Sequence, residues 1–239
     1  MHIIGHRGFK KKYPENTMRS FREAAEFPIE GIECDVHMSS DFVPVIHHDA
    51  TLERTTDGSG LLAMKTYEEL RTLDAGSMTA PAFAGEKIPS LAETADFIKE
   101  KNLWFHLELK EQKHVSDAYF ISTCLEMLRE RMMLTETVIS TFCHRYLREI
   151  KKQQPLVETA MLTKTPFRRG RKYANKNAAD GIHIRHGIQS SMYYKAWRKQ
   201  SIVVRAYHVR KHHEYFRCRQ AGINGIITDD VEKMTKLRF

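Results

Sequence analysis

The chain has 239 residues, of which 41% are apolar, and this is enough for one large domain or two small ones with a sizeable core. Lys and Arg exceed Asp and Glu by 38 − 30 = 8, so the surface is basic and suits an anionic substrate or an anionic membrane surface. No apolar stretch is long enough for a membrane-spanning helix. The four cysteines are scattered without zinc-like spacing, which argues against a cysteine-based metal site.

The first apolar run begins at His2, with no charged-then-apolar signal segment before it. We therefore expect an intracellular, cytoplasmic protein whose thiols are reduced and mostly buried. The densest basic run, Arg168–Lys172, is more typical of a solvated loop or helix start than of a binding site. Net charge alone does not indicate nucleic-acid binding, and we expect no nucleic-acid partner.

Short β-rich runs alternate with helical patterns along the whole chain. Eight strands are predicted, over 2–6, 32–37, 104–109, 138–141, 157–162, 181–184, 202–207 and 225–228. Helices are predicted over 17–27, 118–131, 144–153 and 192–200. This repeated alternation predicts an α/β fold, a (β/α)8 TIM barrel, with residues 1–239 as a single domain.

The stretch between the second and third predicted strands, 41–100, does not fit the simple alternation. We predict a strand extension over 43–47, a helix over 67–73, a loop over 75–85 and a helix over 91–100. Ser90 is the expected N-cap of the last helix, with Glu93 as its capping-box partner. The result is a small insertion after strand 2, approximately residues 50–90, on the face where barrel active sites form.

Acidic side chains follow the strand period of two. Glu33 and Asp35 point to one side of their strand, and Glu108 and Lys110 point to one side of theirs. Inward charges are costly to bury unless they are paired or bind a metal. Glu33, Asp35 and Glu108 form an all-oxygen set, which Mg²⁺ or Ca²⁺ prefers and Mn²⁺ also accepts. The alternative is pairing with Arg7 and Lys110 alone, but three acids exceed two cations.

Two histidines flank the acidic set at strand ends. His6 and His48 are the candidate acid–base pair, because histidine changes charge near neutral pH. The side chain of His47 is expected to point to the opposite side of the chain from that of His48. Asp49, which follows His48, is placed to orient the His48 ring.

Two cations accompany these groups. Arg7 and Lys110 are expected to hold the non-bridging oxygens of a phosphate. The chain lacks both a Walker-type loop and a GxGxxG motif, so a nucleotide-binding function has little support. These residue types together are the parts needed to cleave a phosphodiester.

At these residues the chain resembles the glycerophosphodiester phosphodiesterase family. A His-Arg-Gly run alone is weak evidence, but the ordered set of motifs is highly specific and covers nearly the whole chain. The matching runs are Gly5-His6-Arg7-Gly8, Pro14-Glu15-Asn16-Thr17, Glu33-Cys34-Asp35-Val36-His37, His48-Asp49, Leu107-Glu108-Leu109-Lys110 and Gly225-Ile226-Ile227-Thr228-Asp229.

The resemblance implies a divalent-metal phosphodiesterase that releases glycerol 3-phosphate and an alcohol from a small-molecule glycerophosphodiester. It implies that Glu15 and Asn16 shape a loop beside the site. Carried over by position, the metal ligands are Glu33, Asp35 and Glu108, the acid–base pair is His6 and His48, and the phosphate contacts are Arg7 and Lys110.

The chain departs from the family pattern at positions that bear on substrate preference. The Trp-Thr-x-Asn run usual after strand seven is replaced by Tyr207-His208-Val209-Arg210, and Phe42 replaces a turn glycine. Tyr207 is expected to form an aromatic wall for the glycerol or alcohol group. Three further residues could meet extra negative charge on a substrate or could be ordinary residues of the rim: Arg210, Arg185 and His186.

Several alternatives stay open at this point. A lysophospholipase D or a phospholipase C-like enzyme on lipid substrates would use a similar barrel, with peripheral contact to an anionic membrane. A binding barrel that has lost catalysis is a third reading, although none of its catalytic positions is missing. The nucleophile is either water or the glycerol 2-hydroxyl, and either histidine can be the acid.

Overall fold

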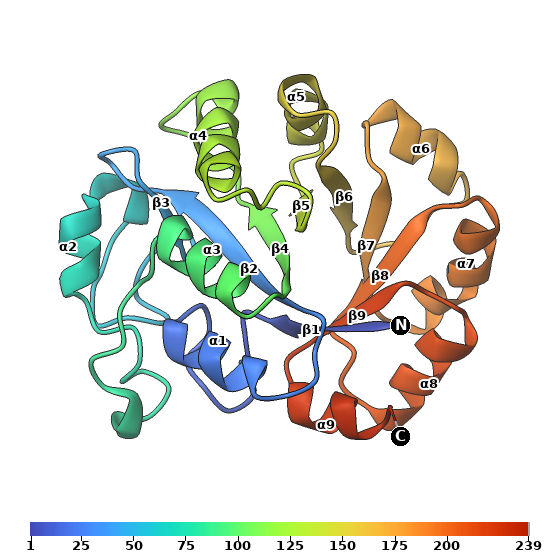
Figure 1. The fold of residues 1–239 in the computed structure, drawn as a ribbon, viewed down its shortest axis with the longest axis horizontal. Coiled ribbons are helices and arrows are strands. Elements are labelled where there is room, and N and C mark those ends of the chain that lie inside the picture. Colours follow the sequence, from blue (N-terminus) through green and yellow to red (C-terminus); the bar gives the residue numbers. More distant parts are fainter. Residues whose placement is uncertain (239) are drawn as a thin grey trace.

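A computed structural model describes residues 1–238. Within them, eight parallel strands close into a barrel, because the sheet order β1-β9-β8-β7-β6-β5-β4-β2 is completed by pairing of β1 with β2 (Figure 1). The predicted (β/α)8 TIM barrel is confirmed. The strands are β1 (His2–His6), β2 (Gly31–Met38), β4 (Trp104–Leu109), β5 (Thr137–Thr141), β6 (Glu158–Thr163), β7 (Gly181–Arg185), β8 (Val203–Tyr207) and β9 (Gly225–Thr228).

Helices surround the strands on the outside of the barrel (Figure 1). They are α1 (Met18–Ala25), α3 (Leu91–Glu100), α4 (Asp117–Glu130), α5 (Arg145–Gln153), α6 (Gly170–Lys176), α7 (Ile188–Lys199), α8 (His212–Gln220) and α9 (Val231–Lys236). Helix α7 begins four residues earlier than predicted, because exposed Ile188 adds nothing to the buried face that marks a helix in sequence.

The apolar core lies mainly between the strands and these helices. Strand residues such as Cys34, Val36 and Leu107 are buried on the outward face, and they belong to one apolar core cluster with Tyr146 and Trp197 of the helix layer. Since side chains alternate along each strand, the polar residues between them face the barrel interior. This arrangement delivers the charged set to the inside of the barrel.

A turn after β2 corrects one prediction. Instead of extending strand 2, β3 (Pro44–Ile46) runs antiparallel to it. The chain reverses where Ser39 Oγ accepts the backbone N–H of Val43 at 2.9 Å and Phe42 takes a left-handed φ of 63°. That conformation suits glycine better, which explains why a pattern of alternating apolar residues does not reveal the turn. The reversal brings the chain after β3 back to β2, where His47 N–H donates to the Asp35 carbonyl at 2.9 Å.

The segment between β3 and α3 has its own small apolar cluster. It holds the short helices η1 (Leu62–Met64), α2 (Tyr67–Thr72) and η2 (Pro81–Phe83) on one side of the barrel (Figure 1). Leu62 of η1 and Leu70 of α2 share the cluster with Val45 and Leu52. The predicted capping box is present: Glu93 N–H donates to Ser90 Oγ at 3.1 Å and Ser90 N–H donates to Glu93 Oε2 at 2.9 Å. Between residues 1 and 238, no helix is both long and apolar enough to cross a membrane.

Two buried histidines in the barrel interior predict a loss of stability in acid. His106 and His183 lie with ring centroids 5.9 Å apart, and neither ring nitrogen of His106 has a hydrogen-bond partner. Burial, reinforced by the charge of Arg205, holds the pKa of both well below the ordinary value of 6.5. Below pH 6.5 the unfolded chain therefore binds protons that the folded protein does not, so the free energy of unfolding falls as pH falls.

Replacing one of these histidines should reduce that pH dependence. His106→Leu breaks no hydrogen bond, and it should lessen the slope of unfolding free energy against pH by about 1.4 kcal/mol per pH unit, the value for one proton. Urea unfolding of both proteins between pH 6 and 4.5 measures the two slopes. Equal slopes would show that His106 is protonated in the folded state or does not contribute.

Candidate functional site

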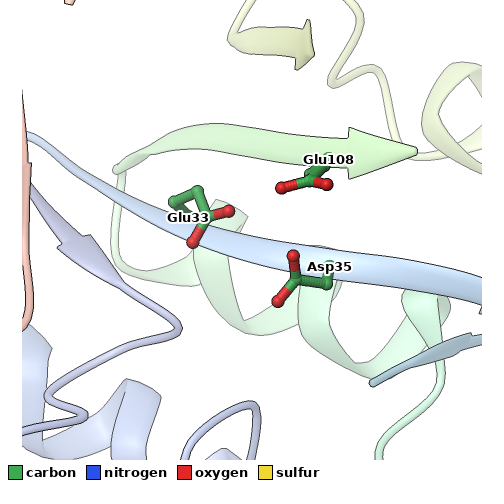
Figure 2. A group of neighbouring side chains, drawn as sticks. All are labelled: Glu33, Asp35 and Glu108. Atoms are coloured by element: carbon green, nitrogen blue, oxygen red, sulfur yellow. The ribbon is translucent and has the colours of Figure 1, made fainter. Parts of the chain in front are cut away.

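Three carboxylates meet inside the mouth of the barrel. Glu33 and Asp35 come from β2, and Glu108 comes from the adjacent β4, where it is the register partner of Asp35. One oxygen from each side chain lies within 4.8 Å of the others, and all three residues are buried. Figure 2 shows the three carboxylates close together, Glu33 and Asp35 beside β2 and Glu108 beside β4. The alternation of side chains along each strand, from which this set was predicted, therefore places all three carboxylates on the inner face of the barrel.

Two cations lie against these carboxylates. Lys110 Nζ is 2.8 Å from Asp35 Oδ1 and 2.5 Å from Glu108 Oε1, and Arg7 Nε is 3.0 Å from Asp35 Oδ2. Although burial opposes it, the two cations hold the pKa of Asp35 well below its ordinary value. Burial and the neighbouring Asp35 raise the pKa of Glu108 to about 7, although Lys110 opposes this shift.

The set fits a hard divalent cation. Burial, followed by repulsion from Asp35 and Glu108, raises the pKa of Glu33 well above its ordinary value. Positive charge is therefore in deficit here even with Arg7 and Lys110 in place. Asp35 Oδ1 is buried, and apart from its ion pair with Lys110 it has no hydrogen-bond partner within residues 1–238. An all-oxygen donor set of this kind suits magnesium, calcium or manganese.

His6 is oriented by a residue at the other end of the chain. Its Nδ1 lies 2.5 Å from Asp229 Oδ1, and since a carboxylate only accepts, Nδ1 is the donor and Nε2 is left free. Nε2 lies 3.9 Å from Glu33, at the edge of the carboxylate set. Asp229 is held in turn by Arg210, whose Nη2 is 2.9 Å from Oδ2.

His48 has the same kind of support. Its Nδ1 donates to Asp49 Oδ1 at 2.5 Å, as the sequence predicted, and Asp49 forms an ion pair with Arg54. Two Arg–Asp–His chains therefore reach the mouth from separate parts of the sequence. In the second chain, Arg54 also contacts Glu15 at 2.7 Å, and Glu15 accepts from Arg7 at 2.7 Å.

Asn16, in the loop of Pro14–Thr17, supports the carboxylates through its side chain, and Arg7 supports them through its backbone. Asn16 has a left-handed φ of 57°, and its Nδ2 donates to Asp35 Oδ2 at 2.9 Å. Arg7 also has a left-handed φ, 54°, and its N–H donates to Glu33 Oε2 at 3.1 Å. Such strain in non-glycine residues persists only where surrounding contacts maintain it, and it is common at functional sites. Glu15 and Asn16 thus lie where the resemblance implied.

Neighbouring histidines have different surroundings. His47 is buried between the Asp49 carbonyl, 2.8 Å from its Nδ1, and Thr55 Oγ1, 3.0 Å from its Nε2. His48, in contrast, lines the cavity together with His6. His37 is buried and its Nε2 donates to the His48 carbonyl at 3.1 Å, so it supports the backbone at this position.

A cavity of about 750 Å³ opens over the carboxylates, and its lining includes every site residue that the sequence predicted except the fully buried Asp35. Tyr207 forms part of the wall, and its OH donates to the Thr163 carbonyl at 3.1 Å. Next to it lies His208, left-handed at φ 61°, with its ring 5.6 Å from that of His6. Phe142 completes this aromatic wall, 6.5 Å from the ring of Tyr207.

Sequence reasoning missed several residues of the site. Asp229 ends a motif that was quoted for the resemblance, but its contact with His6 spans 223 positions and has no local signal. Lys164 follows β6 with no motif around it, although it lines the cavity. Arg54 could have been suspected, since it lies in the run that follows His48-Asp49.

Comparison with known proteins gives a consistent result. Residues 6–233 match the Glycerophosphoryl diester phosphodiesterase family. A glycerophosphodiester phosphodiesterase of Caldanaerobacter subterraneus is 31% identical over 235 residues, which is 98% of this chain and 96% of that protein. A glycerophosphodiester phosphodiesterase of Bacillus altitudinis is 29% identical over 243 residues, covering 99% of this chain and 97% of the relative.

Solved structures agree with this match. An Oleispira antarctica phosphodiesterase, determined with the product sn-glycerol-3-phosphate, superposes with a TM-score of 0.93 at 26% identity, over 100% of this chain and 96% of that one. A phosphodiesterase structure from Thermotoga maritima, at 24% identity and a TM-score of 0.78 over 100% of this chain and 98% of that one, shares the fold. The chain belongs to the glycerophosphoryl diester phosphodiesterase family, and this membership supports hydrolysis of glycerophosphodiesters.

Proposed function

We propose that the protein is a metal-dependent hydrolase that converts glycerophosphodiesters to glycerol 3-phosphate and an alcohol. The observation that carries this proposal is the pair of histidines that flank a buried three-carboxylate cluster in one cavity. Glu33, Asp35 and Glu108 would hold Mg²⁺, Ca²⁺ or Mn²⁺. When bound, the metal would neutralise phosphate charge and act as a Lewis acid.

The remaining residues supply positioning and proton transfer. Arg7 and Lys110, which already face Asp35, would also meet the non-bridging oxygens of the phosphate. His6 and His48 each have Nδ1 bound to an aspartate, which leaves Nε2 to accept a proton from the nucleophile or donate one to the leaving oxygen. Tyr207 would bound the space next to the phosphate.

The nucleophile separates two versions of this reaction. If the glycerol 2-hydroxyl attacks, a cyclic glycerol phosphate forms first and accumulates at early times. If water attacks directly, product oxygen comes from solvent in one step and no cyclic species is trapped by rapid quenching. Cytoplasmic location stays a prediction, which fractionation of cells that express the protein would test.

The direct test is glycerol 3-phosphate release in a coupled assay. Glycerophosphocholine and glycerophosphoethanolamine are offered to EDTA-treated protein, and then magnesium, calcium or manganese is restored. We expect no release with EDTA and recovery with at least one metal. Release that is unaffected by EDTA would contradict the metal, and cleavage only of lysophospholipid micelles would favour the lipid-cleaving alternative.

Asp229→Asn should reduce turnover with little effect on stability. The amide can donate to His6 Nδ1 and so favour the tautomer with the proton on Nε2, which is wrong for a base. We expect kcat to fall about a hundredfold, at the lower end of the usual contribution of an acid–base group, while KM changes little. Asp230→Asn is the matched control, because Asp230 caps α9 through Lys233 N–H at 3.0 Å and asparagine also caps helices. Equal kcat in both variants would contradict a positioning role for Asp229.

A further inference from the structure

The cavity has two chemically different halves. The half next to β1, β2 and β4 carries the three carboxylates and both candidate histidines. The opposite half, formed after β5, β6, β7 and β8, is lined by aromatic and basic residues. Every acidic residue that lines the cavity lies before position 112, and among the described lining residues from 140 onward none is acidic. A diester whose glycerol phosphate is held at the carboxylates would therefore have a wall of basic and aromatic residues opposite it.

Lys164 is one of two cations on that wall without a counter-ion. It is exposed, and its Nζ lies 5.8 Å from the centroid of the Phe142 ring. No carboxylate of residues 1–238 lies within 4.0 Å of this ammonium group. Other lining cations differ in this respect, since Lys10 lies 3.4 Å from Glu15 and Arg210 lies 2.9 Å from Asp229.

Arg185 is the second such cation, at the rim of the cavity and not among the residues that line it. It ends β7 and is the register partner of Tyr207 on β8. Register partners on adjacent parallel strands point to the same face of the sheet, and Tyr207 lines the cavity. Arg185 therefore projects on the inner face at the mouth, where it is exposed and, within the described chain, pairs with no carboxylate.

We propose that this wall is the subsite for the alcohol group, an inference that rests on the proposed function. Lys164 and Arg185 would select alcohols that carry a second negative charge, either a phosphate or a carboxylate. A quaternary ammonium group would need the face of an aromatic ring. The Phe142 face already holds the Lys164 ammonium, and Tyr207 is the register partner of Arg185, so a second cation at either ring meets like-charge repulsion. The same wall attracts an anion by the charge of both side chains.

Three substrate pairs that each differ by one charged group test this selection. Glycerophosphoinositol is compared with glycerophosphoinositol 4-phosphate, and glycerophosphoethanolamine with glycerophosphoserine, so that added phosphate and added carboxylate are measured separately. Glycerophosphocholine is compared with its uncharged 3,3-dimethylbutyl analogue. We expect kcat/KM to be about tenfold higher for the phosphorylated member at low salt, with this ratio falling as ionic strength rises. The choline ester should be cleaved more slowly than its uncharged analogue.

Charge-removing variants assign the effect to residues. Lys164→Gln and Arg185→Gln should each lower the phosphorylated-to-unphosphorylated ratio about threefold, within the range of an exposed ion pair, so that the two residues together account for the tenfold preference. Lys199→Gln is the matched control: Lys199 is an exposed lysine in the last turn of α7, outside the cavity lining, so the ratio should keep its wild-type value. The two side chains are exposed, so these changes leave the core intact.

The outcomes separate the inference from the function on which it rests. Cleavage of glycerophosphoinositol with a ratio near one, or with a ratio that Lys164→Gln and Arg185→Gln leave unchanged, would overturn the anionic subsite and keep the phosphodiesterase. A higher rate on the choline ester than on its uncharged analogue would also overturn it. Failure to release glycerol 3-phosphate from any of the diesters would overturn both proposals.

Discussion

Glu108→Gln should abolish metal-dependent glycerol 3-phosphate release while the barrel stays folded. The carboxylate is one of three that would hold the metal, and glutamine keeps its shape but offers a weak neutral ligand. Metal coordination contributes several kcal/mol of transition-state stabilisation, so a loss of about 4 kcal/mol corresponds to about a thousandfold in rate.

The same substitution should not cost stability. Burial and the charge of Asp35 already raise the pKa of Glu108 to about 7, so the ionised side chain is held against repulsion. An amide removes that repulsion, and its oxygen still accepts from Lys110 Nζ, which lies 2.5 Å from Glu108 Oε1. We therefore expect the free energy of unfolding in EDTA to stay within about 1 kcal/mol of the wild type, or to rise.

Glu111→Gln is the control for charge at this cavity. Glu111 also lines the cavity, but it pairs with Arg145 at 2.7 Å, an exposed ion pair that contributes about 1 kcal/mol or less. Activity and Mn²⁺ binding by calorimetry should survive this change and be lost in Glu108→Gln. Full activity of Glu108→Gln with restored metal would remove Glu108 from the ligand set.

The barrel could be predicted from the sequence because the patterns that mark its strands and helices involve residues close together in the chain. Alternation between strand and helix patterns depends on neighbours two to four positions apart, and a parallel strand with one apolar face is visible as in Glu33-Cys34-Asp35-Val36. Helix α8 shows the limit of this reasoning. Of its nine residues only Tyr215 and Cys218 are buried, so the apolar stripe that would mark it in sequence is nearly absent, and packing on the barrel stabilises it.

The residues of the candidate site also fall into those that the sequence could predict and those that it could not. Glu33, Asp35 and Glu108 could be predicted because they share strands and register, and His48 could be predicted because Asp49 adjoins it. The partner of His6 could not, since Asp229 reaches it only when β9 closes the barrel beside β1. Long-range contacts of this kind are fixed by topology, and no local pattern encodes them.

His47 and His48 are adjacent residues after β3, but we expect only His48 to take part in proton transfer. Substituting each histidine in turn tests this difference. His48→Gln should lower kcat about a hundredfold to ten-thousandfold, the usual range for an acid–base group, with little change in melting temperature. The reason is that its side chain is 31% exposed, and its one hydrogen bond to another side chain within residues 1–238 is to Asp49. His47→Gln should retain kcat within about threefold when folded, because the ring does not line the cavity.

His47→Gln should instead destabilise the protein. Its buried ring satisfies the Asp49 carbonyl and Thr55 Oγ1, and groups left without partners there cost about 1–3 kcal/mol. At about 2–4 °C per kcal/mol for a chain of this size, the melting temperature should fall by several degrees. Measuring kcat and melting temperature for both variants therefore gives opposite patterns if His48 performs the proton transfer. Loss of kcat in His47→Gln with an active His48→Gln would move that role to His47 and require the turn after β3 to rearrange when substrate binds.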